Sequence, residues 1–119
     1  MPARRLGFPK SHRLTRSSEF ERIKKNGRVQ RGKFLILSAL PGQADPFRAG
    51  FITSRKIGGA VIRNRVRRRL REIVRKHQAD IIDGTWVITI ARVPAARVDY
   101  NELEGEWLRL ARRASILAP

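Results

Sequence analysis

Residues 58–77, GGAVIRNRVRRRLREIVRKH, decide how this chain folds and indicate what it binds. A glycine pair interrupts the chain, and the apolar residues that follow recur at helical spacing: Ile62, Val66, Leu70, Ile73 and Val74. This pattern predicts a helix that runs to about His77 and packs on the protein interior along one side. The other side carries six arginines between residues 63 and 71, so that it faces outward.

The outward side of this helix is almost purely cationic. On a 3.6-residue period its arginines form rows: Arg63, Arg67 and Arg71 in one, Arg68 and Arg75 beside it, and Arg65 and Arg69 at the far edge. A solvated helix normally mixes signs, whereas here Glu72 is the only acid against eight cations. Like charges at this spacing destabilise a helix until an anion binds, and the helix therefore predicts a polyanion partner.

The residue types favour RNA as that polyanion. The planar guanidinium can donate two parallel hydrogen bonds to phosphate oxygens or stack on a base, whereas an ammonium group can do neither. Asn64 adds a donor and an acceptor that suit a base edge or a 2′-hydroxyl. Arg55 and Lys56 extend the patch, and Gly58-Gly59 either lets backbone N–H groups approach a phosphate or simply permits a tight turn into the helix.

The charge is concentrated in one part of the chain. Of the 27 Lys and Arg residues that give the net charge of +17, residues 1–76 hold 22, with only four of the ten acids. A compact domain with this charge repels itself unless a polyanion neutralises it. The chain has no cysteine, no signal-peptide pattern and no apolar run long enough to span a membrane, so we expect a soluble protein of a reducing, cytoplasmic compartment.

The segments before the arginine helix predict a short helix and two strands. Ser18 followed by Glu21 fits a capping box and predicts a helix over 18–26. Phe34–Leu40 and Phe47–Ser54 are apolar runs separated by a segment rich in turn formers. They predict a β-hairpin.

The segments after it predict an interior strand and a final helix. Trp86–Ala91 is apolar on both faces, as a central strand would be. Asp99 and Glu102 repeat the capping-box spacing before the apolar stripe of a last helix: Leu103, Trp107, Leu110, Ala111 and Ala114. Both tryptophans are expected in the core. The order of elements predicts one α+β domain over 17–119, preceded by a basic N-terminal arm over 1–16.

The stretch from Ser54 to Arg68, SRKIGGAVIRNRVRR, closely resembles the signature of the bacterial ribonuclease P protein family. The resemblance extends to Arg13-Leu14 before Phe20 and to Ile90-Ala91-Arg92, in the same order along the chain. It implies a ribosomal-protein-like α/β sandwich, with a four-stranded mixed sheet and three helices. It also implies a left-handed βαβ crossover around the arginine helix, against the usual right-handed rule.

The same resemblance implies a function as the protein subunit of a ribonucleoprotein that removes the 5′ leader from precursor tRNA. The reaction would be Mg²⁺-dependent hydrolysis of one phosphodiester, with the metal ions held mainly by the RNA subunit and no catalytic residue in the protein. The protein would be monomeric in a 1:1 complex with that RNA. The residues expected to bind the RNA subunit are Arg55, Lys56, Arg63, Asn64, Arg65, Arg67, Arg68 and Arg71.

The family also binds the single-stranded leader in a cleft between the first helix and the sheet. The residues carried over to this cleft, or expected to substitute there, are Arg13, Phe20, Lys24, Arg28, Arg31, Leu37 and Ser54. Phe20 either stacks a base or belongs to the core. Lys24 and Leu37 stand where the family often has further aromatics. The alternative to base stacking is therefore electrostatic binding of the leader through Lys24, Arg28 and Arg31.

Three other functions compete with this one. A ribosomal or other structural RNA-binding protein would share the charge, the size and the fold class. A nuclease with its own active site would depend on His12 or His77, since Asp80 and Asp83 suit a turn better than a metal cage. A DNA-binding protein would need a recognition helix with short polar side chains, which the arginine helix does not offer.

Overall fold

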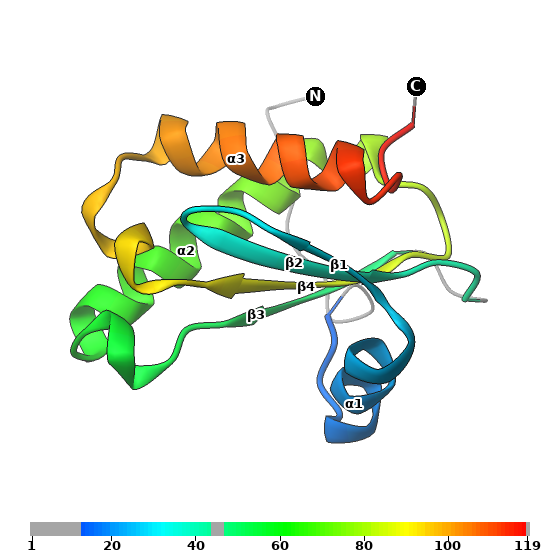
Figure 1. Cartoon of the computed structure of the whole chain (residues 1–119), viewed down its shortest axis with the longest axis horizontal. Coiled ribbons are helices and arrows are strands. Elements are labelled where there is room, and N and C mark those ends of the chain that lie inside the picture. The colour runs from blue at the N-terminus through cyan, green and yellow to red at the C-terminus, as the bar shows by residue number, and fades with distance from the viewer. Residues whose placement is uncertain (1–12, 44–46, 119) are drawn as a thin grey trace, which may run out of the picture.

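Three helices cover the two faces of a four-stranded sheet in the computed structural model, which describes residues 13–43 and 47–118 (Figure 1). The elements in chain order are α1 (Ser17–Asn26), β1 (Arg28–Arg31), β2 (Leu35–Leu40), β3 (Arg48–Ile52), η2 (Arg55–Ile57), α2 (Ala60–His77), η3 (Gln78–Asp80), β4 (Trp86–Ala91), η4 (Val93–Arg97) and α3 (Tyr100–Arg113), where η marks a 3₁₀ turn. The predicted fold class, a four-stranded mixed sheet with three helices, is confirmed.

The sheet has the strand order β1-β2-β4-β3. The β1–β2 and β2–β4 pairs are antiparallel, whereas β3 and β4 are parallel and are joined by α2 as the crossover. The predicted hairpin between the second and third strands is therefore wrong, because β4 lies between them. β4 is apolar on both faces and takes the interior position, and β3 becomes an edge strand. The left hand of the β3–α2–β4 crossover stays a prediction.

The hairpin of this protein is β1–β2, and β1 was not predicted. Its sequence, Arg-Val-Gln-Arg, has no apolar alternation, so only pairing with β2 makes it a strand. The turn is fixed from α3: the Glu106 carboxylate accepts the backbone N–H groups of Lys33, Phe34 and Leu35 at 2.9, 2.7 and 2.7 Å. Glu106 is 2% exposed, and a Cβ on Gly32 would lie 2.5 Å from its Cδ. The hairpin is thus anchored to α3 by one buried carboxylate.

Side chains of each strand alternate between two apolar layers. In β2, Leu35, Leu37 and Ala39 belong to the main core beneath α2 and α3. The intervening positions face α1, where Leu40 packs with Ile23 and with Trp86. Figure 1 shows the result, with α2 and α3 on one side of the sheet and α1 on the other. The period of two along each strand thus divides the core between the two faces.

Both tryptophans are buried, as predicted, and they serve different layers. Trp107 of α3 is fully buried in the main core, and its Nε1 donates to Thr89 Oγ1 at 3.0 Å. Trp86, at the start of β4, is 8% exposed and lies in the smaller layer under α1.

The two predicted helix caps have different outcomes. The cap of α3 is confirmed, because Asp99 Oδ1 accepts from the backbone N–H of Glu102 at 2.9 Å. The Ser18–Glu21 capping box of α1 is wrong. The helix begins at Ser17, and Glu19 Oε1 accepts the backbone N–H groups of Thr15 and Arg16, both at 3.0 Å.

The predicted boundary between arm and domain at residues 16 and 17 is also wrong. Leu14 is buried, and its backbone N–H donates to the carbonyl of Ala49 at 3.0 Å, so that residues 13–16 already pack against the edge of β3. The rest of the predicted arm, residues 1–12, lies outside the described residues. Within the described ranges, no helix is both long enough and apolar enough to cross a membrane.

Candidate nucleic-acid interface

α2 is fixed to the core along one side and presents cations on the other, as its sequence predicts. The buried side consists of Val66, Leu70, Ile73 and Val74, all fully enclosed. On the opposite side Asn64, Arg65, Arg68 and Arg71 are exposed, while Arg63, Arg67 and Arg69 are half-buried at the margins. The helix therefore cannot rotate its arginines away from solvent without opening the core.

The arginines at the two margins of α2 are held by neighbouring segments. Arg65 Nη2 donates to the carbonyl of Ala96 at 3.4 Å, and Arg69 Nη1 donates to that of Val98 at 2.9 Å. On the other margin Arg67 Nη2 donates to Thr53 Oγ1 at 2.5 Å. These bonds neutralise no charge. They fix the direction in which the guanidinium groups point.

Four of the arginines of α2, two of them at the margins, have no acidic partner in the described part of the chain. None of the ion pairs formed by the described residues includes Arg63, Arg67, Arg68 or Arg71. Glu72, the one acid of α2, is bonded to Arg75. Arg67 Nη1 also reaches Asn64 Oδ1 at 3.3 Å, which leaves the Asn64 amide N–H₂ as the free donor of that side chain. We call Arg63, Arg65, Arg67, Arg68 and Arg71 the α2 row. A row of cations with no internal counter-charge can attract phosphates.

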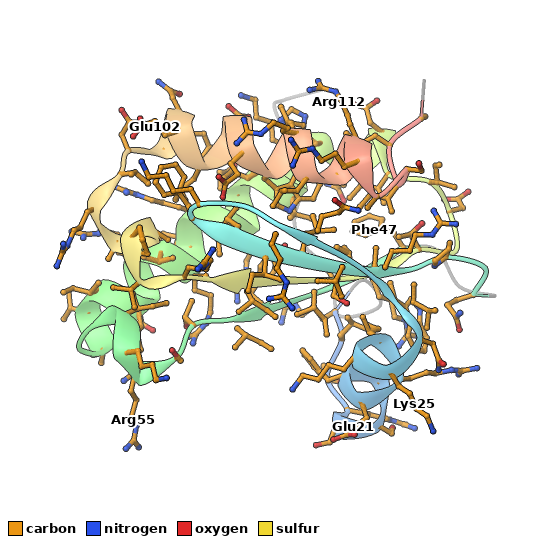
Figure 2. All side chains as sticks on the ribbon, viewed as in Figure 1. Glu21, Lys25, Phe47, Arg55, Glu102 and Arg112 are labelled. Atoms are coloured by element: carbon orange, nitrogen blue, oxygen red, sulfur yellow. The ribbon has the colours of Figure 1, made fainter. Side chains whose placement is uncertain are left out.

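η2 carries Arg55 and Lys56 into solvent just before α2. Ile57 is buried and fixes this turn to the domain, and Figure 2 shows Arg55 pointing away from it. Gly58 has φ +153°, and a Cβ there would lie 3.0 Å from Ile62 Cδ1, so this glycine is required by the turn. Gly59 has an ordinary φ of −70° and open space where a Cβ would be.

A groove runs between α1 and β3, and we call it the α1 groove. It consists of two hollows that share Thr15 and Phe20. The first, of about 310 Å³, is lined by Thr15, Ser17, Phe20, Glu21, Lys24 and Ile52. The second, of about 170 Å³, is lined by Arg13, Leu14, Thr15, Phe20, Ala49, Gly50, Phe51, Arg67 and Arg71. Two residues of the α2 row therefore form one wall of the α1 groove.

Phe20 lies where the two hollows meet. It is half-buried and packs with Leu14 and Ile23, so it is part of the smaller apolar layer. Its ring also covers Gly50, where a Cβ would lie 2.8 Å from Phe20 Cζ. The ring lines both hollows as well, so Phe20 packs on the apolar layer and is also reachable from the groove; base stacking by Phe20 stays a prediction.

Two residues predicted for the cleft do not belong to it. Leu37 is fully buried in the main core on the opposite face of the sheet, since strand side chains alternate and its neighbour Ile36 takes the α1 side. Arg28 Nη1 donates to the carbonyl of Ala114 at 3.1 Å, at the end of α3. Both are corrections to the predicted site. Each follows from the register of β1 and β2, which the sequence alone did not fix.

Of the other predicted cleft residues, two line the α1 groove and two, Arg31 and Ser54, line neither of its hollows. Lys24 and Arg13 line it. Arg31 is paired with Ile36 and so shares the α1 side of the sheet, and Ser54 is exposed ahead of η2. The sequence prediction did not include Ile52 and Gly50, which line the α1 groove, or Thr53, which accepts a hydrogen bond from Arg67. The alternation of the third strand could have identified Ile52, but nothing in the sequence relates Thr53 to Arg67.

Glu19 is a buried acid beneath this basic surface. Burial raises its pKa, but the backbone N–H groups of Arg16 and Thr15, together with the nearby Arg48, outweigh this and hold the pKa below its ordinary value. Arg48 Nη1 lies 3.0 Å from Glu19 Oε2. Glu19 is therefore an anion that ties α1 to β3.

The residues considered for an intrinsic active site are scattered. His77 Nε2 lies 2.8 Å from Glu104 Oε2, and its ring stacks on Trp107 with centroids 6.4 Å apart. Asp80 and Asp83 are exposed in the segment between α2 and β4, and His12 lies outside the described residues. No three His, Asp or Glu side chains of ranges 13–43 and 47–118 gather closely enough to hold a metal ion.

Comparisons with known proteins agree with this geometry. The family model described as Ribonuclease P matches residues 8–115. The ribonuclease P protein component of Roseiflexus castenholzii is 37% identical, covering 91% of this chain and 89% of that protein. That of Dehalococcoides mccartyi is 39% identical, with 91% and 88% covered.

Solved structures show the same fold. The RNase P protein of Staphylococcus aureus superposes with a TM-score of 0.82 at 27% identity, covering 89% of this chain and 97% of that one. The RNase P protein of Thermotoga maritima gives a TM-score of 0.77 at 28% identity, with 85% and 96% covered. The family match spans the arginine helix, the α1 groove and nearly all of the sheet. This chain therefore belongs to the ribonuclease P protein family.

Proposed function

We propose that this chain is the protein subunit of a ribonuclease P ribonucleoprotein, which holds the catalytic RNA with α2 and the 5′ leader of precursor tRNA with the α1 groove. The observation that supports this most strongly is the continuity of two surfaces. Arg67 and Arg71 belong to the α2 row and also line the groove that contains Phe20. One bound RNA and one single strand could thus meet on the same side of the domain.

The α2 row suits a folded RNA. Arg63, Arg65, Arg67, Arg68 and Arg71 have no acid partner among the described residues, and the marginal arginines are pre-oriented by bonds to Ala96 and Thr53. Pre-orientation lowers the entropy that is lost when the complex forms. Arg55 and Lys56 extend the same charge beyond the start of the helix.

The α1 groove suits a single strand. Two aromatic side chains line it, Phe20 in both hollows and Phe51 in the second, and a base stacked on one of them would contribute about 1–3 kcal/mol. Lys24, Arg13 and Arg71 supply cations for the backbone. With Leu37 buried on the other face, Phe20 is the aromatic at the meeting point of the two hollows. The leader would therefore be held by base stacking and by electrostatic attraction together.

Catalysis in this proposal resides in the RNA subunit. The described residues supply no cluster that could hold Mg²⁺, so the ions that activate water and stabilise the leaving oxygen would be held by RNA. The protein would screen phosphate repulsion and lower the Mg²⁺ concentration that the RNA needs. We propose a monomer in a 1:1 complex, acting in the cytoplasm.

Reconstitution tests the proposal. The purified protein is mixed with a ribonuclease P RNA, and precursor-tRNA cleavage is measured as Mg²⁺ is lowered. We expect the protein to restore cleavage at Mg²⁺ concentrations where the RNA alone is inactive, and we expect no cleavage by the protein alone. Cleavage by the protein alone that is lost in His77→Ala would instead indicate an intrinsic active site.

A leaderless tRNA tests the groove separately. We expect the protein to strengthen holoenzyme binding of precursor tRNA but not of mature tRNA, because only the precursor has a strand for the α1 groove. Equal enhancement of both substrates would contradict the assignment of the groove to the leader.

A further inference from the structure

A third hollow lies beside α1, on the flank away from Phe20. It measures about 240 Å³ and is lined by Arg16, Ser18, Glu19, Arg22 and Trp86. Ser17 lines the α1 groove and Ser18 lines this hollow, so the first turn of α1 separates the two.

The hollow is rich in positive charge. The Arg22 guanidinium lies 5.9 Å from the centroid of the Trp86 ring, and the Arg48 guanidinium lies 5.8 Å from it. The acid of the site is already engaged: the Glu19 carboxylate accepts from the backbone N–H groups of Thr15 and Arg16 and from Arg48. Glu19 supplies one negative charge against the three guanidinium groups of Arg16, Arg22 and Arg48, so the site keeps a net positive charge.

One buried hydrogen-bond donor of the hollow's lining also lacks an acceptor within the described ranges. Trp86 is more than nine-tenths buried, and its indole Nε1 has no partner among the described residues. The Nε1 of Trp107 is satisfied by Thr89. Buried N–H groups in native proteins nearly always have an acceptor, so an unsatisfied one beside a cationic hollow indicates a missing ligand that accepts hydrogen bonds.

We propose that this hollow binds a phosphate group of single-stranded RNA, so that the strand in the α1 groove continues around the first turn of α1. The ligand must be an anion with several acceptors, because the groups left for it are donors: the Ser18 hydroxyl, the Arg16 and Arg22 guanidiniums and the Trp86 N–H. Arg16 and Arg22 are exposed and can turn aside to admit it without unfolding the helix. This inference rests on the proposed leader binding and adds a contact to it.

The indole N–H signals test the inference without any cleavage assay. The chain has two tryptophans, so ¹⁵N-labelled protein gives two such signals, which Trp86→Phe assigns. On titration with a short oligouridylate we expect the Trp86 signal to move saturably while the Trp107 signal stays in place. A fixed Trp86 signal, with shifts at Phe20 and Lys24, would overturn the proposal and leave the α1 groove intact.

A charge-matched pair of variants tests the same site in the holoenzyme. Arg22→Gln removes a cation from the hollow, whereas Lys25→Gln removes one from the same helix but lines none of the three hollows. We expect Arg22→Gln to weaken the binding of leader-containing precursor tRNA about fivefold and to reduce the slope of log K against log salt by about 0.7. Lys25→Gln should change the binding of precursor tRNA and the salt slope less than Arg22→Gln does. Both variants should bind the RNA subunit as tightly as the unmodified protein.

Two outcomes would separate the failure of this inference from that of the proposed function. Equal effects of Arg22→Gln and Lys25→Gln overturn the phosphate site, although reconstituted cleavage still stands. Failure of the unmodified protein to support cleavage overturns the proposed function, and the oligouridylate titration still decides whether the Trp86 hollow binds RNA.

Discussion

α2 and α3 lie side by side on the same face of the sheet, and both are amphipathic, but they use their charges in opposite ways (Figure 1). Two of the three acids of α3 act inside the protein: Glu106 holds the β1–β2 turn, and Glu104 bonds Lys76 and His77 at the end of α2. The central arginines of α2 have no such partner among the described residues. These two acids of α3 thus hold neighbouring segments of the fold, whereas the central arginines of α2 stay available to a ligand.

This difference shows why counting charge along the chain is a limited guide. Residues 77–119 hold five cations and six acids, and so look neutral. Three of those acids, Asp99, Glu104 and Glu106, are bonded within the protein. The cations Arg109, Arg112 and Arg113 are exposed on the outer side of α3, where Figure 2 shows Arg112 pointing away from the sheet. The number of charges can be counted from the sequence. Whether a charge is paired within the protein depends on which element its side chain contacts.

The largest expected effect is on α3. Glu106→Ala removes the acceptor of three backbone N–H groups in a buried site, and we expect the free energy of unfolding to fall by about 4 kcal/mol. Urea denaturation measures it. Glu102→Ala, an exposed acid on the same helix, is the control and should cost less than about 1 kcal/mol. Similar losses in both variants would contradict the role of Glu106 as the anchor of the hairpin.

The opposite behaviour is expected on α2. Arg68→Gln together with Arg71→Gln should leave the free energy of unfolding unchanged or slightly higher, since like-charge repulsion along the helix is relieved. RNA-subunit affinity should fall by about 2 kcal/mol, roughly thirtyfold at moderate salt, with a shallower salt dependence. Filter binding over a series of salt concentrations measures both.

Arg69→Gln is the matched control for this pair. It removes one arginine of the same helix, but one that donates to the carbonyl of Val98. We expect a loss of stability of about 1 kcal/mol and a smaller change in RNA affinity. Arg69→Gln could instead weaken RNA binding as much as the double variant. Arg69, which is bonded to a backbone carbonyl, would then contribute to RNA binding as much as Arg68 and Arg71 do.

The sequence predicted the elements with strong local patterns and missed those that depend on pairing. α2 was located from its glycine pair to His77, because five apolar residues repeat at one period. β1 has no such pattern, and the order of the strands is a property of the whole sheet, so the β2–β3 hairpin was a reasonable but wrong prediction. Leu37 was placed in the cleft from the family resemblance, but the register of β2 turns it to the other face of the sheet.

The site was predicted to a similar extent. The residue types of α2 were enough to predict its exposed cationic side. The contact of Arg67 with Thr53, the continuity of the α2 row with the α1 groove, and the hollow beside Trp86 each join segments far apart in the chain. No local pattern carries that information.

A smaller effect is expected where the two helices meet. The hydrogen bond from His77, partly opposed by burial, together with Lys76 holds the pKa of Glu104 below its ordinary value of 4.5. A carboxyl group with a lowered pKa stabilises the fold above its unfolded pKa and loses that contribution as the pH falls through its folded value. Glu104→Gln should cost about 1 kcal/mol at neutral pH. The difference from the unmodified protein should shrink below pH 4.5, as unfolding curves at several pH values would show.

The smallest effect concerns how the two helices end. After α3 the chain turns through Ser115, which has φ +59°, so that the Ile116 N–H can reach the carbonyl of Ala111 at 3.1 Å. After α2 the chain continues through Gln78 with a right-handed helical φ of −60°. Glycine adopts the left-handed conformation without the steric cost of a Cβ, but it loses more entropy where the backbone is helical.

Ser115→Gly should therefore stabilise the protein by about 0.5 kcal/mol, whereas Gln78→Gly should destabilise it by a similar amount. Ser115→Ala retains the Cβ and should bring no gain. Thermal unfolding of the three variants measures the differences. A glycine that acted in the same direction at both positions would mean that the ends of α2 and α3 are less different in backbone conformation than their φ angles indicate.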